Sequence, residues 1–183
     1  MLKDARVRTL ALVSDLNDSQ LIGPKLPTVN PLLWEIGHVA YFCEYFVLRQ
    51  LYGFESILKN KADAIYDSIK VKHEDRWNLT LLNRAETLEY MENIQECLFA
   101  QLSKEFASEA ESFAIQFAIL HEDMHSEAFL WGRQTLGYPK PKLEKNINNT
   151  SSIVFGNLDR FVDIPGGDFI FGTTPDEPFL FDN

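Results

Sequence analysis

The longest helical pattern of the sequence, between Ser108 and Gly137, restricts the fold more than any other feature. Ser108 is placed to cap this helix, and Glu109 and Glu111 follow in the first turn, where the helix dipole favours negative charge. Gly137 ends the pattern, and Pro139 beyond it cannot continue a helix. A helix of this length needs a partner for its apolar face, so the pattern predicts a helical bundle.

Three further amphipathic stretches, each a predicted helix, lie at about residues 2–16, 31–52 and 84–106. The second has Asn30 as its predicted N-cap and Pro31 at the first helical position, where a missing N–H costs nothing. The irregular segment before the third stretch is expected to hold a short helix near residues 61–68. The fold class is therefore predicted as mainly α, with an antiparallel four-helix bundle over residues 1–138.

The composition changes after the bundle. Residues 139–158 read as a polar linker, and residues 159–183 carry a strand–turn–strand pattern. The residues with this β signal are Phe161, Val162, Ile164, Phe169, Ile170 and Phe171. Two strands cannot bury their own apolar surface, so residues 159–183 are predicted to be the truncated start of a second domain, and the chain to be the front part of a longer protein.

Charge and hydropathy exclude several classes of partner. The formal net charge of −10 would repel a phosphate backbone, so no nucleic-acid partner is expected. No stretch approaches the run of apolar residues that spans a bilayer, and the N-terminus lacks the apolar core of a signal peptide. A cytoplasmic protein without a membrane partner is predicted.

The histidines are the first sign of chemistry. His121 and His125 stand four residues apart on one face of the long helix, close enough to share a metal ion. His38 is the natural third ligand, because Gly37 beside it suggests a close approach in mid-helix. The alternative for His38 is a core histidine that bonds to a neighbouring helix. His73, in a charged segment, is expected to be exposed to solvent.

The sequence His121-Glu122-Asp123-Met124-His125 also fits the H-E-x-x-H pattern of zinc metalloproteases. A zinc hydrolase of this kind needs a later third ligand, yet no histidine follows His125, and Glu144 lies in the Lys-rich linker. Hydrolysis is therefore kept only as a lesser alternative. Outside a protease, Glu122 would either orient an imidazole or be a solvated helix residue, and the sequence leaves both open.

Three segments resemble a known family: "VNPLLWEIGHVAYFCEYFVLR", "LHEDMHSEAFLW" and "VDIPGGDFIFGTTPDEPFLFDN". In this order they are similar to the DinB-like bundle and the opening of the formylglycine-generating-enzyme-like domain of ergothioneine-biosynthesis sulfoxide synthases (EgtB). Related enzymes make selenoneine or ovothiol. The resemblance covers nearly the whole chain and implies that the second domain is of α+β, C-type-lectin-like fold.

The resemblance also implies an activity. His38, His121 and His125 would bind non-haem Fe(2+), and the substrates would be a small-molecule thiol, a histidine-derived imidazole and O2. An oxidative C–S or C–Se bond would form on the imidazole ring. The loop around Arg76 resembles a family region that contacts the carboxylate of the thiol substrate. The catalytic tyrosine of the family belongs to the C-terminal domain, so the catalytic residues stay unknown and residues 1–183 are expected to be inactive alone.

Other interpretations of the site remain. DinB-like bundles with three histidines also occur as thiol transferases that use zinc or nickel, and a non-catalytic metal-binding bundle is the third alternative. Four aromatic residues, each equally compatible with ordinary core packing, are candidates for the walls of the site: Trp34, Tyr41, Phe42 and Trp131. The apolar C-terminal side chains, including Phe179 and Phe181, are expected to fold back on the bundle or to support a homodimer.

Overall fold

The computed structural model describes residues 1–102, 108–143 and 161–174. The chain separates into two units, Met1–Leu143 and Glu144–Asn183. The elements of the first unit are α1 Leu2–Val13, α2 Asp18–Ile22, α3 Leu32–Cys43, the π-helix η1 Glu44–Arg49, α4 Asn60–Tyr66, the 3₁₀-helix η2 His73–Asp75, α5 Arg84–Leu102 and α6 Glu109–Thr135. The prediction of a mainly helical chain is confirmed for this unit.

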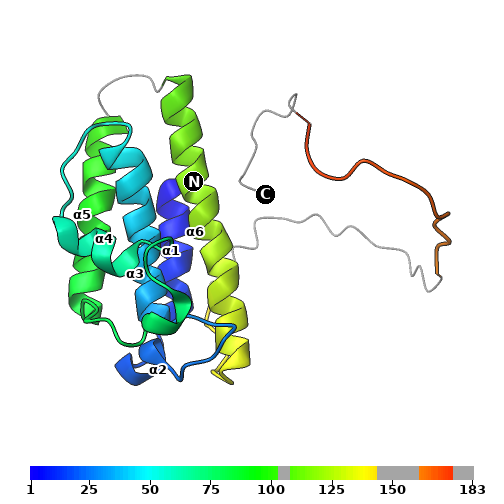
Figure 1. Ribbon diagram of the computed structural model, residues 1–183, viewed down its shortest axis with the longest axis horizontal. Coiled ribbons are helices and arrows are strands. Elements are labelled where there is room, and N and C mark those ends of the chain that lie inside the picture. Colours follow the sequence, from blue (N-terminus) through cyan, green and yellow to red (C-terminus); the bar gives the residue numbers. More distant parts are fainter. Residues whose placement is uncertain (103–107, 144–160, 175–183) are drawn as a thin grey trace. The chain divides into compact units, whose positions relative to one another are not determined.

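The four longest helices, α1, α3, α5 and α6, lie side by side (Figure 1). Helix α1 packs on α6, and α3 packs on both α5 and α6. Helix α3 is the centre of the arrangement, since its side chains from Leu32 to Tyr41 are all buried. Large apolar side chains from three helices, among them Trp34, Leu98 and Phe129, form one core around it.

The prediction of an antiparallel four-helix bundle is wrong for two packed pairs, α1 with α6 and α3 with α5. Arg6 bonds Glu122, and Asp15, just beyond the end of α1, bonds Arg133 of α6, so α1 and α6 run in the same direction. Arg84 at the start of α5 bonds Asp18 beyond the end of α1, while the side chain of Arg6 donates to a carbonyl in the middle of α5. Helix α5 is therefore antiparallel to α1.

Helix α3 runs opposite to α6. Its early residue Glu35 contacts His125, and its later residue Phe42 contacts Phe117. The short link between α5 and α6 makes those two helices antiparallel. The long connection from η1 to α5 returns the chain to the end of the bundle at which α3 begins. Connection length thus sets the directions of the helices.

The predicted helix ends agree closely with the structure in α6. Ser108 accepts a hydrogen bond from the Glu111 backbone, and the Glu111 side chain accepts one from the Ser108 backbone, which completes a capping box. Gly137 follows the helix with a positive φ of 67°.

Two other helix ends differ from the predictions. Helix α3 begins at Leu32 with Pro31 as its cap, one residue later than expected. The first helix stops at Val13, because Asn17 caps the separate helix α2 through its own capping box.

The described part of the second unit, residues 161–174, contains no strand. The side chains with the β signal, from Phe161 to Phe171, are exposed there. The predicted strands are therefore absent from this segment, as expected for strand material without a sheet to pair with. Phe179 and Phe181 lie outside the described residues. Within the described residues no helix has the length and apolar content to cross a membrane.

Candidate metal centre

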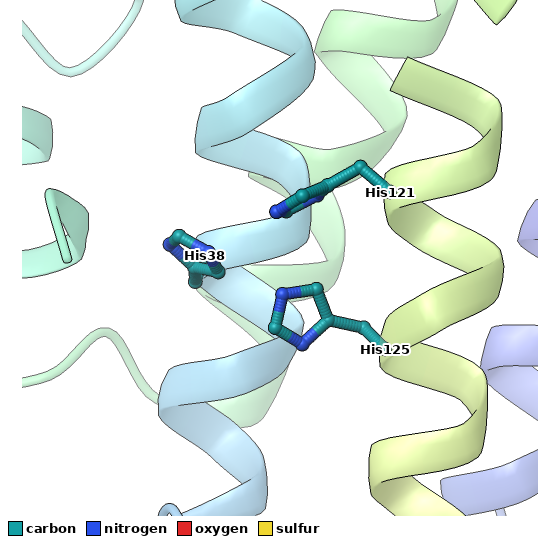
Figure 2. A group of neighbouring side chains, drawn as sticks. All are labelled: His38, His121 and His125. Atoms are coloured by element: carbon teal, nitrogen blue, oxygen red, sulfur yellow. The ribbon is translucent and has the colours of Figure 1, made fainter. Parts of the chain in front are cut away.

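The structure brings together the three histidines that the sequence singled out. His38 projects from α3 toward His121 and His125 on α6 (Figure 2). One ligand nitrogen from each ring can be chosen so that all three lie within 4.8 Å of one another. All three residues are buried, so the cluster lies inside the bundle.

The cluster contains polar atoms that the protein does not satisfy. Among the described residues, Nδ1 of His121 and Nε2 of His125 are buried and have no hydrogen-bond partner. Burial lowers the pKa of His38 to about 3 and that of His121 to about 2, with a smaller contribution from His125 in each case. His38 and His121 are therefore neutral at physiological pH and keep a nitrogen lone pair for a ligand. A metal ion would satisfy the unpartnered nitrogens, so the residues fit one.

His38 is held through its second nitrogen. Its Nδ1 lies 2.8 Å from the carbonyl oxygen of Tyr66, which can only accept, so Nδ1 carries the proton and Nε2 is left for a ligand. Gly37 makes this contact possible, because a Cβ at that position would lie 2.2 Å from the Tyr66 ring. The close approach predicted at Gly37 is thus a neighbouring aromatic ring.

His125 is held by a residue that the sequence reasoning missed. Nδ1 of His125 lies 2.6 Å from a carboxylate oxygen of Glu35, which is 2 % exposed. A carboxylate at this nitrogen orients the imidazole and leaves Nε2, the unpartnered atom, for the ligand. The available signal was a glutamate inside an otherwise apolar helix segment, three residues before His38.

Two aromatic rings from α3 lie flat against the histidines. Trp34 stacks on His38 with ring centroids 4.8 Å apart, and Phe42 stacks on His121 at 3.5 Å, each with 8° between the planes. Of the other predicted wall residues, Tyr41 is buried and packs near Tyr45, while Trp131 is 54 % exposed.

Glu122 has a role that neither prediction for it anticipated. It is buried, and its two carboxylate oxygens lie 2.8 and 3.2 Å from the guanidinium of Arg6, while Thr9 donates to it at 2.9 Å. Glu122 is therefore neither solvated nor an orienting partner of an imidazole. The sequence could not show this, since Arg6 lies on another helix, far away in the chain.

Arg76 and His73 are both partly buried. The Arg76 guanidinium lies 3.8 Å above the Trp34 ring, and Arg76 donates to Asn30 at 2.6 Å. Burial lowers the pKa of Arg76. The prediction that His73 is solvent-exposed is wrong, because its Nε2 lies 2.7 Å from the backbone oxygen of Val29 and its ring packs against Trp77.

The three imidazole nitrogens limit which metal ions the site can bind and which reactions it can support. Three imidazole nitrogens suit zinc, copper, iron or nickel, and they leave coordination positions open on an ion that prefers more than three ligands. Such a site is suited to binding and activating small molecules rather than to a closed structural role.

Comparison with known proteins places the chain in a family. The profile of the DinB superfamily matches residues 1–128, so the chain belongs to the DinB superfamily. This region includes His38, His121 and His125.

Three similar curated proteins are all named hercynine oxygenase. The protein from Mycobacterium tuberculosis is 29% identical over 127 residues, which cover 69% of this chain and 29% of the relative. The protein from Mycolicibacterium thermoresistibile is 28% identical over 131 residues, covering 69% and 28%. The protein from Mycolicibacterium smegmatis is 26% identical over 189 residues, covering 98% and 41%. The chain thus spans well under half the length of these relatives.

Proposed function

We propose that this member of the DinB superfamily is the metal-binding part of an iron(II)- and O2-dependent enzyme that forms a C–S or C–Se bond on a histidine-derived imidazole. The observation that carries the proposal is the buried cluster of His38, His121 and His125, in which two nitrogens have no partner among the described residues. The names of the relatives support an oxygenase that acts on hercynine, and the three sequence segments quoted above support the sulfoxide-synthase type.

The protein groups around the cluster have separate tasks in this proposal. Bound Fe(2+) would supply the O2 chemistry and would favour the thiolate form of the thiol substrate. Glu35 holds the proton of His125 at Nδ1, and the Tyr66 carbonyl holds that of His38 at the equivalent atom. Trp34 and Phe42 cover two of the rings and exclude water from their faces.

Arg76 is proposed to bind the carboxylate of the thiol substrate. Its guanidinium rests on Trp34, which also stacks on the metal-ligand candidate His38. The Nε atom of Arg76 is buried and has no hydrogen-bond partner among the described residues. A carboxylate placed there would offset the desolvation that lowers the pKa of this arginine.

The alternatives differ in what they need from the bundle. A zinc hydrolase would use Glu122 as its general base, but both oxygens of that carboxylate are engaged by Arg6. A thiol transferase would use the same three histidines with zinc or nickel and would need no O2. The transferase is therefore the alternative that an experiment must separate from the oxygenase.

The second unit completes the proposal. Residues 159–183 are proposed to open a formylglycine-generating-enzyme-like domain of C-type-lectin-like fold, which would supply the catalytic residues. The bundle alone would then bind metal without turnover. A homodimer formed through the apolar residues of the second unit is a further proposal.

The test compares the 183-residue chain with a longer, uninterrupted protein that carries the complete second domain assumed in the proposal. Both are purified without air, analysed for metal, and mixed with a thiol and trimethylhistidine while O2 uptake and C–S bond formation are recorded. The proposal predicts iron in both and O2 uptake only in the uninterrupted protein. Thiol transfer that needs zinc and no O2 would establish the transferase instead.

A further inference from the structure

The three imidazoles of the cluster are anchored in unequal ways. His38 donates its Nδ1–H to the Tyr66 carbonyl, and Nδ1 of His125 is bonded to Glu35. Nδ1 of His121, by contrast, is buried without a hydrogen-bond partner among the described residues. A hydrogen bond at Nδ1 therefore fixes two of the ring planes but not the third.

The ring of His121 has a different neighbour. The phenyl ring of Phe42 lies parallel to it, with an angle of 8° and a centroid separation of 3.5 Å, the shortest among the ring contacts of the described residues. Phe42 comes four residues after His38, so it lies on the same side of α3 and faces α6. The contact thus crosses the interface between the helices that carry the ligands.

We propose that Phe42 is a positioning residue that fixes the plane of the His121 imidazole and strengthens its binding to a metal ion. The inference rests on the metal site of the proposed function and adds to it a residue that offers no ligand atom.

The first reason is steric. Rotation about the bond that joins Cβ to an imidazole has a broad energy profile, so a histidine without a hydrogen-bonded ring nitrogen has no strongly preferred ring plane. A flat ring in parallel contact removes most of that freedom. Phe42 is itself held by Phe46 and Phe117, whose ring centroids lie 4.4 and 5.3 Å from its own.

The second reason is electrostatic. A divalent ion bound to an imidazole draws electron density out of the ring and makes its faces more positive. The face of a phenyl ring is negative, so its attraction to the imidazole increases when the metal binds. Phe42 should therefore stabilise the metal-bound state more than the metal-free state, and an aliphatic side chain of similar size should not.

The experiment uses Co²⁺ as a probe, because its visible absorption reports both the affinity and the geometry of the site. The 183-residue chain is compared with Phe42→Leu, which removes the ring, and Phe42→Tyr, which keeps it. Phe99→Leu is the matched control, since Phe99 is 37 % exposed and lies on α5, which carries none of the three histidines. Thermal unfolding of each metal-free variant is measured in parallel.

The expected result is a Co²⁺ affinity that is about threefold to tenfold weaker in Phe42→Leu, with an altered visible spectrum. Phe42→Tyr and Phe99→Leu should stay within about twofold of the parent and keep its spectrum, in line with the retained stack. If Phe42→Leu does not fold, Phe42→Met provides a second ring-free variant of flexible shape.

Two results would overturn the inference, and they are distinguishable. Equal affinity and an unchanged spectrum in a folded ring-free variant would show that Phe42 is only core packing, with the metal site intact. Failure of the parent chain itself to bind Co²⁺ would remove the metal site of the proposed function, and the role of Phe42 with it.

Discussion

Helix α6 has two polar interfaces, which differ in whether their buried polar groups have partners among the described residues. Toward α1 it presents Glu122 and Arg133, whose charges are met by Arg6 and Asp15. Toward α3 it presents His121 and His125, and each of these rings retains a buried nitrogen with no hydrogen-bond partner among the described residues. Both interfaces bury polar side chains, yet only the first satisfies them.

The difference separates the residue of this motif that stabilises the fold from the two residues that are proposed to bind a ligand. In the run from His121 to His125, the glutamate belongs to the satisfied interface and the two histidines belong to the unsatisfied one. A buried polar group without a partner costs about 1 to 3 kcal/mol, so a natural protein keeps one mainly where a ligand will supply the partner. The α1 interface is therefore assigned to stability, and the α3 interface carries the proposed metal site.

The largest effect is expected from removing a ligand. His38→Ala, His121→Ala and His125→Ala should each reduce the affinity for Fe(2+) by at least about 100-fold, because a ligand contributes more than the orienting partners for which roughly 10- to 100-fold is typical. Metal content after anaerobic dialysis measures this. His73→Ala is the control, since that ring is bonded to Val29 outside the cluster. Unchanged iron binding in His38→Ala would mean that the third ligand lies elsewhere.

Glu122→Gln should act on the other interface. It leaves the buried guanidinium of Arg6 without its counter-charge, which is expected to lower the free energy of unfolding by about 3 kcal/mol. Metal content should not change in the folded protein. Urea unfolding and metal analysis measure the two effects, with Glu127→Gln, an exposed position on the same helix, as the control. Peptidase activity that disappears in Glu122→Gln would instead support the hydrolase.

Glu35→Gln tests the partner of His125. The amide can still bond to the ring but carries no charge, so the affinity for Fe(2+) or Co²⁺ should fall by roughly 10-fold, at the lower end of the range for such partners. Glu44→Gln is a matched control, because Glu44 is also buried but accepts from Tyr90 and from the backbone of Ile57. Equal metal affinities in the two variants would contradict the assignment of Glu35.

The last effect concerns pH in the metal-free protein. The pKa values of His38 and His121, about 3 and 2, lie below the ordinary 6.5, so unfolding takes up protons at these groups when the pH is lower than about 6.5. Their contribution to stability is complete above pH 6.5 and is lost as the pH falls from 6.5 toward 3. Each group contributes at most about 1.4 kcal/mol per pH unit to the pH dependence of the free energy of unfolding.

The comparison that isolates this effect is between the parent and His121→Phe, which removes one titrating ring but keeps an aromatic side chain. Urea midpoints are measured from pH 7 to pH 4 in the presence of a chelator. The variant should show a shallower loss of stability over that range. An identical slope would show that His121 is protonated as readily in the folded chain as in the unfolded one.

Local chemistry made much of the fold predictable from the sequence. The capping box at Ser108 and the positive φ at Gly137 depend only on neighbouring residues, so the bounds of α6 could be read directly. The pairing of His121 with His125 follows from helix geometry alone. The short helix α4 was expected for the same kind of reason, and it lies at Asn60–Tyr66.

The tertiary structure decided which polar groups meet. Glu35 and Glu122 are both glutamates within helical patterns, close to a histidine, and the sequence does not show which of them meets an imidazole. Orienting an imidazole was one of the two roles left open for Glu122, but Glu35 takes that role and Glu122 pairs with Arg6. The outcome depends on which helix lies opposite each face, and therefore on the direction in which α1 and α3 run along α6.

The sequence by itself thus determined the main helices, the caps of α6 and the pairing of His121 with His125, because each depends on contacts between residues close in the chain. Only the tertiary structure decided the parallel arrangement of α1 and α6, the stacking of Phe42 on His121 and the partners of the two glutamates. These features join residues far apart in the sequence. Their energies depend on burial and on the neighbours that packing supplies, which local patterns do not encode.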